Sequence, residues 1–574
     1  MTRLLFILVF ACCCYQAKAQ DMITPFEKSG GKKTATYFEA IAFYKELASH
    51  YGTVRTLNAG ETDAEYPLHV VFYCSDRKFN PQKIKAQKKL VILINNAIHP
   101  GEPDGVDASM MLLHDVATKK ITLPKNIVLA VVPVFNVGGT LNRGSWSRAN
   151  QNGPEEYGFR GNAQNLDLNR DFIKMDAKET QSLVELFHHL DPDLFIDNHV
   201  SNGADYQHVM TLLSVNPKKQ GYYLGKYLEN QMEPALYQSM KQKGYDLVPY
   251  VNHWGNTPDS GWQQFYEPPR FASGFVALFQ TLAFVPETHM LKPYQQRVDA
   301  TYALLQTFID YAAQHFDEIK QVRAMERALM LDKNDFTLDW KADTLKTMIS
   351  FKGYEAAYKE SKVSGKPRLY YDRTKPYTKL VPFYNKFLPT STAQAPQYYI
   401  VPQGWHKVIT RLKWNDVAMT KLAHDTNMQV TVYRIENYET VKKPFEGHYL
   451  HHHVTYTKQT ETVHFYKGDY LIATTQDAKR YLVETLEPDA PDAFFAWGFF
   501  DAVLQQKGGY SDYVFEDDAA NLLEKNPDLR KALAEKKATD TSFNNDGRAQ
   551  LDFIYRHSPY NETEFMRYPV YRIE

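Results

Sequence analysis

The sequence predicts an α/β fold: a mostly parallel mixed sheet covered by helices on both faces, followed by a β-rich C-terminal region. Apolar runs rich in Val, Ile and Leu in the first half end in polar or Gly/Pro loops, which is typical of strands buried on both faces. Amphipathic helical segments lie between these runs, and this alternation favours a parallel sheet. In the second half, short strand-like runs follow one another with turn residues between them.

In chain order, the first expected element is a helix over 36–51. The expected buried strands share a continuous apolar character and cover 68–75, 88–97, 126–136 and 192–200. The expected helices between them carry apolar residues at helical spacing and cover 105–119 and 176–191. A further apolar run and a closing helix cover 274–287 and 294–316. Functional groups gather at the carboxyl ends of strands in such sheets, where His99, Asn136 and His199 are expected.

The length of 574 residues is too great for one ordinary domain, so two or three are expected. We expect an α/β domain over 20–320, a charged linker helix over 321–345 and a β-rich accessory region over 346–574. Several short strands with turn-rich spacing in the last of these suggest a β-sandwich-like module.

The overall composition fits a globular enzyme: 44% of residues are hydrophobic, and 66 basic residues balance 67 acidic ones. This balance gives no electrostatic reason to expect nucleic acid or an anionic membrane surface as a partner. No internal repeat, coiled coil or low-complexity tract is evident.

The first nineteen residues have the pattern of a secretory signal. Arg3 gives the positive start, an apolar run over 4–11 follows, and the small-x-small sequence at 17–19 is a cleavage site before Gln20. The apolar run is too short to span a membrane. We therefore expect a secreted or periplasmic protein with no integral membrane segment after cleavage.

The cysteines are consistent with this leader. Residues 9–11 match poorly the small residues that a lipid-attachment site at Cys12 needs, so a lipid anchor is not expected. Three of the four cysteines lie in the leader, so cleavage leaves only Cys74 and excludes an internal disulfide. Cys74 lies in a predicted buried strand, where cysteine is usually inert packing.

Three residues form a candidate metal-ligand set. His99 and Glu102 are three apart in a Pro/Gly-rich turn after a strand, and His199 ends another strand at the same sheet edge. Catalytic zinc commonly takes three such ligands and keeps a fourth position open. The alternatives are a polar turn exposed to solvent for the first pair and a hydrogen-bonded structural histidine for His199.

These residues, with Asp167-Leu168-Asn169-Arg170 and a later Glu287, resemble in order and spacing the zinc carboxypeptidase family typified by carboxypeptidase A. The resemblance covers residues 37–315. It implies one Zn²⁺ per chain, held by His99, Glu102 and His199, in a zinc peptidase catalytic domain over 20–320.

The resemblance also implies roles for the Asp167–Arg170 segment. Asp167 matches the carboxylate that holds the first ligand histidine, and such a partner fixes the imidazole tautomer. Asn169 and Arg170 match the pair that grips the terminal carboxylate of the substrate, for which a guanidinium fork is suited. A capping Asp and an ordinary surface Arg are the alternatives. The expected partner is a peptide with a free carboxylate.

The remaining catalytic positions follow from the same resemblance. Glu287 matches the general base, and Arg148 is preferred for the arginine that polarises the scissile carbonyl because it closely follows Trp146. Arg143 is the alternative, and Arg160 is a weaker third. Tyr266 is the nearest candidate for the substrate-contacting tyrosine, although its spacing departs from the family.

The leading hypothesis is a secreted metallocarboxypeptidase. The alternatives are a zinc amidase or endopeptidase acting on cell-wall peptides, and a non-catalytic relative that binds peptides or glycans. Small residues at 272–274, where the family builds its side-chain pocket, weakly favour neutral or apolar substrate side chains.

Overall fold

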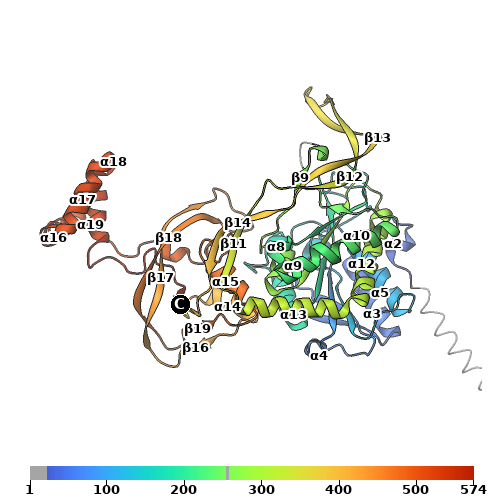
Figure 1. Cartoon of the computed structure of the whole chain (residues 1–574), viewed down its shortest axis with the longest axis horizontal. Coiled ribbons are helices and arrows are strands. Elements are labelled where there is room, and N and C mark those ends of the chain that lie inside the picture. The colour runs from blue at the N-terminus through green and yellow to red at the C-terminus, as the bar shows by residue number, and fades with distance from the viewer. Residues whose placement is uncertain (1–21, 254–256) are drawn as a thin grey trace, which may run out of the picture.

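The computed structural model describes residues 22–253 and 257–574, so the signal predicted over 1–19 lies outside the described residues. Its centre is a mixed sheet in the N-terminal half, which contains nine strands within the described ranges (Figure 1). The main path runs in the spatial order β1 (Val54–Gly60), β2 (Leu68–Tyr73), β4 (Ile127–Val132), β3 (Leu90–Asn95), β5 (Leu194–Asp197), β10 (Leu282–His289), β7 (Met210–Ser214), β8 (Val248–Pro249). The ninth strand, β6 (His199–Ser201), pairs with β10 beyond the end of β5.

The middle of this sheet is parallel, as the sequence predicts. β3 pairs in parallel with β4 and β5, and β10 pairs in parallel with β5 and β6. The antiparallel pairs lie further out, where β1 meets β2, β2 meets β4 and β7 meets β10. The carboxyl ends of β3 and β5 therefore open onto one edge, next to β6 and the second half of β10.

Helices cover both faces because side chains alternate along each strand. Leu90, Ile92 and Ile94 of β3 belong to one core, and Val91 and Leu93 belong to the other. The first core is covered by α3 (Tyr37–His50), α5 (Asp104–Ala117) and α12 (Tyr294–Gln314). The second is covered by α7 (Lys178–Leu190), α11 (Ala272–Val276) and α15 (Lys479–Leu486). The last of these helices comes from the C-terminal half, so the two halves share one core.

The predicted linker helix needs correction. α13 covers Phe316–Asp332 and begins earlier than expected, and the strand β11 (Asp335–Ala342) occupies much of the rest of 321–345. The sequence DFTLDWKA alternates apolar and polar residues, which suits a half-buried strand, and β11 pairs with β14 (Phe387–Gln394). The division of the chain into domains at these positions remains a prediction.

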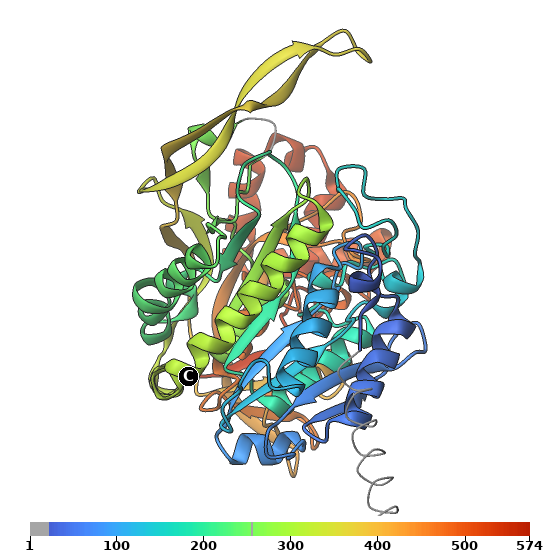
Figure 2. The same ribbon diagram turned by 90° about the vertical axis from the view of Figure 1, so that its right-hand side faces the viewer.

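A long hairpin of β12 (Thr347–Glu360) and β13 (Pro367–Tyr384) follows β11 and projects from the body of the molecule (Figure 2). Its base is attached to the N-terminal half, because β13 pairs with β9 (Trp262–Gln263) and Gln207 Nε2 donates to the carbonyl of Gly353 at 2.8 Å.

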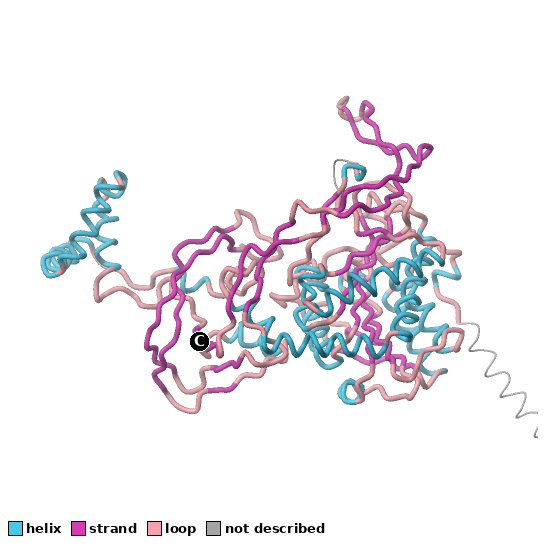
Figure 3. The backbone as a smooth tube through the Cα atoms, viewed as in Figure 1, coloured by secondary structure: helices cyan, strands magenta, loops and turns pink. Residues whose placement is uncertain are grey.

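The β-rich C-terminal region is confirmed for its middle part, whose strands are drawn in magenta in Figure 3. Six strands form its larger sheet among the described residues, in the order β16 (Thr420–Lys421), β19 (Tyr470–Ala473), β15 (Tyr398–Val401), β20 (Tyr571–Ile573), β17 (Thr426–Thr440), β18 (His451–Phe465).

The range 346–574 is not uniformly β-rich, since its later part contains helices. α16 (Asp512–Lys525), α17 (Pro527–Thr539), α18 (Thr541–Asn544) and α19 (Gly547–Arg556) form a group with its own small core that stands apart in Figure 1. No helix in 22–253 or 257–574 combines the length and apolar character needed to cross a bilayer.

Candidate active site and metal centre

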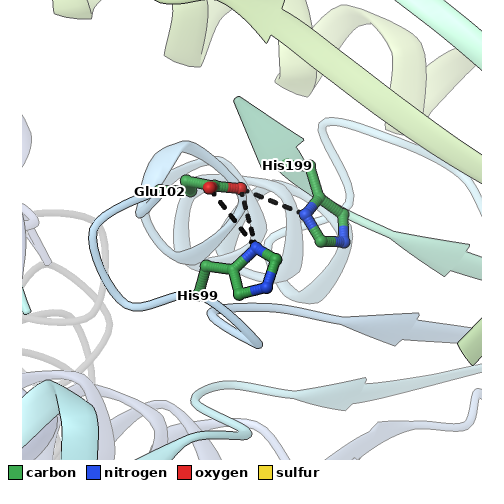
Figure 4. A group of neighbouring side chains, drawn as sticks. All are labelled: His99, Glu102 and His199. Atoms are coloured by element: carbon green, nitrogen blue, oxygen red, sulfur yellow. Dashed lines mark hydrogen bonds and ion pairs between the residues drawn. The ribbon is translucent and has the colours of Figure 1, made fainter. Parts of the chain in front are cut away.

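The three predicted metal ligands meet at the carboxyl edge of the sheet. His99 follows β3, Glu102 comes just before α5, and His199 begins β6 (Figure 4). Their exposed fractions are only 4%, 3% and 5%. The Nδ1 atoms of His99 and His199 lie 3.3 and 3.0 Å from the Glu102 carboxylate. One ligand atom from each residue can reach a common point, so the group can hold a metal ion.

Each of the two histidines has an aspartate within hydrogen-bond distance of Nε2, the ring nitrogen that does not face Glu102. His99 Nε2 lies 3.0 Å from Asp167 Oδ1, and His199 Nε2 lies 3.0 Å from Asp197 Oδ2. Protons on the two Nε2 atoms leave the Nδ1 lone pairs facing Glu102, which is the tautomer that a metal ligand needs. The chemistry of the donor set therefore fits Zn²⁺ with two nitrogens and a carboxylate. Asp197 was missed in the sequence, although it lies two residues before His199, the spacing that puts both on one face of a strand.

Asp167 also carries an ion pair with Arg160, whose Nη2 lies 2.9 Å from Oδ2. Burial acts to raise the pKa of the Asp167 carboxyl, but the neighbouring His99 and Arg160 outweigh it and hold this pKa well below its usual range. Asp167 therefore stays ionised beside His99, as a carboxylate that orients an imidazole must.

A cavity of about 360 Å³ opens above the ligands. It brings together most of the residues that the sequence singled out, and its full lining is His99, Glu102, Arg148, Arg160, Asn169, Arg170, His199, Val200, Asn202, Leu213, Tyr250, Asn252, Phe265, Glu267, Phe271 and Glu287.

Glu287 lies on β10 and lines this cavity. Burial raises the pKa of its carboxyl to about 8, against the opposing effect of His199. In its ionised form this carboxyl can accept a proton from water held near the metal site, and its raised pKa makes it a stronger base for that step.

The two candidate arginines differ in their position relative to the cavity. Arg148 lines the cavity, with its Nη2 2.8 Å from Glu102 Oε1. Arg143 lies elsewhere, with its Nη2 donating to the carbonyl of Thr34 at 2.9 Å. Arg160, the weaker third candidate, also lines the cavity and adds a second positive charge.

Asn169 and Arg170 lie together in a short 3₁₀ turn over Leu168–Arg170. Asn169 Oδ1 accepts a hydrogen bond from the Ala272 N–H at 3.0 Å. The Arg170 guanidinium stacks 3.9 Å from the centre of the Phe271 ring, and its Nη1 donates to the Asn169 carbonyl at 2.7 Å. These contacts fix the guanidinium at the cavity wall. Among the described residues, the carboxylate nearest to it is that of Asp167, 3.9 Å away.

Tyr266 does not meet the expectation of a substrate contact. Its ring packs 5.7 Å from that of Phe387 and lies under the Lys219 ammonium, outside the cavity. Its neighbours Phe265 and Glu267 line the cavity instead. The tyrosine at the cavity wall is Tyr250, which follows β8.

Glu267 is a second residue that the sequence did not indicate. It lines the cavity, and its carboxylate accepts a hydrogen bond from Ser273 Oγ. Burial raises the pKa of this carboxyl. No basic side chain among the described residues forms an ion pair with it. The cavity wall next to the small residues at 272–274 is therefore acidic and not neutral.

Comparison with known proteins finds no matching family model. The chain is 22% identical over 464 residues to carboxypeptidase 2 of Trichophyton tonsurans, covering 74% of this chain and 77% of that protein. It is 21% identical over 492 residues to carboxypeptidase 2 of Trichophyton rubrum, with 79% and 82% covered.

Among solved structures, a metallo-carboxypeptidase from Burkholderia cenocepacia matches 49% of this chain and 70% of its own, with 14% identity and a TM-score of 0.36. One from Pseudomonas aeruginosa, in complex with (2-guanidinoethylmercapto)succinic acid, matches 50% and 70%, with 16% identity and a TM-score of 0.37. The similarity to curated carboxypeptidases over most of the chain agrees with the His₂Glu group and the cavity above it.

Proposed function

We propose that this protein is a secreted or periplasmic zinc carboxypeptidase that hydrolyses the peptide bond next to a free C-terminal carboxylate. The observation that supports this most strongly is the content of one cavity. A His₂Glu group, a buried carboxylate at Glu287 and the Asn169-Arg170 pair all line it. Placement outside the cytoplasm depends on the signal pattern at 1–19.

The proposed chemistry divides between the metal and the chain. Zinc held by His99, Glu102 and His199 would supply a Lewis acid that polarises the scissile carbonyl and makes water more acidic. Glu287 accepts the proton of the attacking water and later returns it to the leaving amine.

The cations around the cavity orient the substrate. Arg170, with Asn169 beside it, holds the terminal carboxylate through a forked, charge-assisted contact. Arg148 stabilises the negative charge that develops on the carbonyl oxygen. Tyr250, not Tyr266, is the proposed aromatic contact.

Glu267 extends the proposal to the substrate side chain. Within 22–253 and 257–574, the Ser273 hydroxyl alone donates a hydrogen bond to this carboxylate, which lines the cavity. A substrate cation would therefore stabilise it. We therefore expect a preference for a positively charged or amine-bearing C-terminal residue. This replaces the neutral or apolar preference that residues 272–274 suggested.

The alternatives from the sequence make different demands. An amidase or endopeptidase does not need an arginine that binds a terminal carboxylate. A non-catalytic relative that binds peptides or glycans does not need a general base such as Glu287. The test is release of a C-terminal amino acid from a free-acid peptide, abolished by a chelator and restored by stoichiometric Zn²⁺. Chelator-resistant release would contradict the metal site, and absence of release with zinc bound would favour the binding relative.

A further inference from the structure

We infer that Glu446, in the C-terminal region, is a positioning residue for the loop that carries Asp167, Asn169 and Arg170. The C-terminal region is then part of the framework of the active site and not an appended module. The kinetic test of this inference rests on the proposed carboxypeptidase function, and a second readout below does not.

The contact is direct. The Asp167 N–H donates to Glu446 Oε2 at 2.8 Å, across 279 positions of sequence. The side chain of Asp167 holds His99 Nε2 at 3.0 Å and Arg160 at 2.9 Å. Glu446 therefore fixes the backbone of Asp167, and Asp167 orients the proposed metal ligand His99. Asp167 is thus the one residue that links Glu446 to His99.

The turn that presents Glu446 is unusual for a glutamate. Glu446 and Gly447 have φ values of 49° and 84°, and Phe445 and His448 exchange hydrogen bonds across them at 2.7 and 3.0 Å. A two-residue turn with both central residues in the left-handed region favours Asn-Gly. Glutamate at the first position is disfavoured sterically. In this conformation the Glu446 carboxylate reaches the Asp167 N–H.

The turn is anchored at its other end. His448 Nε2 lies 2.7 Å from Asp176 Oδ2, and its Nδ1 lies 2.8 Å from the carbonyl of Trp497. The aspartate lies shortly after Arg170 in the chain, so the active-site loop is held by the C-terminal region at two points.

The opposite wall of the carboxylate site is attached to the same region. The Arg270 N–H donates to Asp492 Oδ2 at 2.9 Å, and the Arg270 Nε lies 2.7 Å from Asp492 Oδ1. Arg270 precedes Phe271, the ring on which Arg170 stacks. The two segments that carry the guanidinium and its stacking partner therefore both contact residues 445–497.

The test is Glu446→Asn. Asparagine suits the left-handed position better than glutamate but is too short to reach the Asp167 N–H in the same geometry. The melting temperature should therefore not fall. KM for a free-acid peptide should rise about tenfold, the usual effect of losing a charge-assisted hydrogen bond that holds a binding loop, with a smaller change in kcat. Zinc content should stay at one per chain.

Two further variants sharpen the result. Glu446→Gln keeps an acceptor of the same length and should restore KM to near the wild-type value. Glu65→Asn is the matched control, because Glu65 is an exposed glutamate with φ of 61° and should leave KM unchanged. Should Glu446→Asn lower stability, Glu446→Gly keeps the turn and gives the same comparison. A folded Asn or Gly variant with wild-type KM, or a Gln variant as impaired as the Asn variant, would overturn the positioning role.

Hydrogen exchange gives a readout that needs no activity. The Asp167 amide should exchange faster in Glu446→Asn than in the wild type or in Glu65→Asn. Unchanged exchange at Asp167 overturns this inference even if the carboxypeptidase function holds, and faster exchange supports it even if that function fails.

Discussion

Glu287 lies directly opposite His199 in the parallel pairing of β10 with β6. The proposed general base and a proposed metal ligand are therefore held by neighbouring strands of the central sheet, not by mobile loops. The carbonyl of Glu287 also accepts a hydrogen bond from Thr211 Oγ1 at 3.2 Å. A site built on strands keeps its geometry when one side chain is replaced, so variants here should report on chemistry.

Glu287→Gln should separate metal binding from catalysis. The amide keeps the size of the side chain but cannot accept the proton of water, so turnover should fall by at least about a hundredfold. Zinc content, measured by atomic emission, should remain near one per chain. Wild-type turnover would leave the role of base to another residue.

Arg170→Ala should discriminate between exopeptidase and endopeptidase action. Loss of the forked contact should lower kcat/KM on free-acid peptides by roughly 30- to 150-fold, corresponding to about 2–3 kcal/mol. Amidated peptides should be cleaved poorly by both proteins and should show little difference. Arg143→Ala is the matched control because Arg143 lies outside the cavity, with its Nη2 bound to the Thr34 carbonyl. Equal losses on both substrates would indicate a structural role for Arg170.

Glu267→Gln should change substrate preference more than overall activity. The variant should lose about tenfold or more in kcat/KM on peptides ending in Lys or Arg, in line with a lost charge-assisted contact, and should lose little on peptides ending in Leu. The ratio of the two values in one protein preparation is the measurement. An unchanged ratio would assign Glu267 to the structure of the pocket wall.

Asp191→Asn should lower stability without touching the site. Asp191 directly follows α7 and lies in the left-handed region, with φ of 52°. Its carboxylate forms ion pairs with Arg323, at 2.6 Å, and with Arg327, and both arginines lie on α13. Asparagine tolerates that backbone conformation, so the change isolates the charge. We expect a loss of about 2–3 kcal/mol in the free energy of unfolding, less than for a fully buried pair.

The pH dependence of this loss has a defined sign. Burial acts to raise the pKa of Asp191, but Arg323 and Arg327 outweigh it and hold the folded-state pKa well below its usual range. The stabilisation is therefore complete above the unfolded pKa, near 4, and shrinks as pH falls below it. The difference between wild type and variant in urea unfolding should narrow from pH 6 to pH 3. Asp310→Asn, at an exposed 3.4 Å pair with Lys243, should change stability by less than about 1 kcal/mol.

The sequence predicts the sheet and most of the site for a simple reason. His99 and His199 lie at ends of strands with strong apolar patterns, and Asp167, Asn169 and Arg170 are adjacent in the chain, so short-range pattern locates them. Tyr250 and Glu267 could not be found this way, because no local pattern in the sequence indicates that they face the cavity. The contact of Glu446 with Asp167 joins positions 279 apart and leaves no local pattern.

The C-terminal region shows the same limit. The sequence predicts a helix where β11 lies, because charged residues of α13 precede the strand without a Gly or Pro to mark the boundary. Tyr481 of α15 is fully buried against Phe275 and Phe279 of the N-terminal half. Only the tertiary packing reveals that this helix covers the sheet.

The central claim is most directly tested by mass spectrometry of a defined peptide with a free C-terminal lysine after incubation with the zinc-loaded protein. Our account predicts loss of one C-terminal residue as the first product, with the amidated form of the same peptide left intact. Internal cleavage of both forms, or no change in either when zinc is bound, would contradict it.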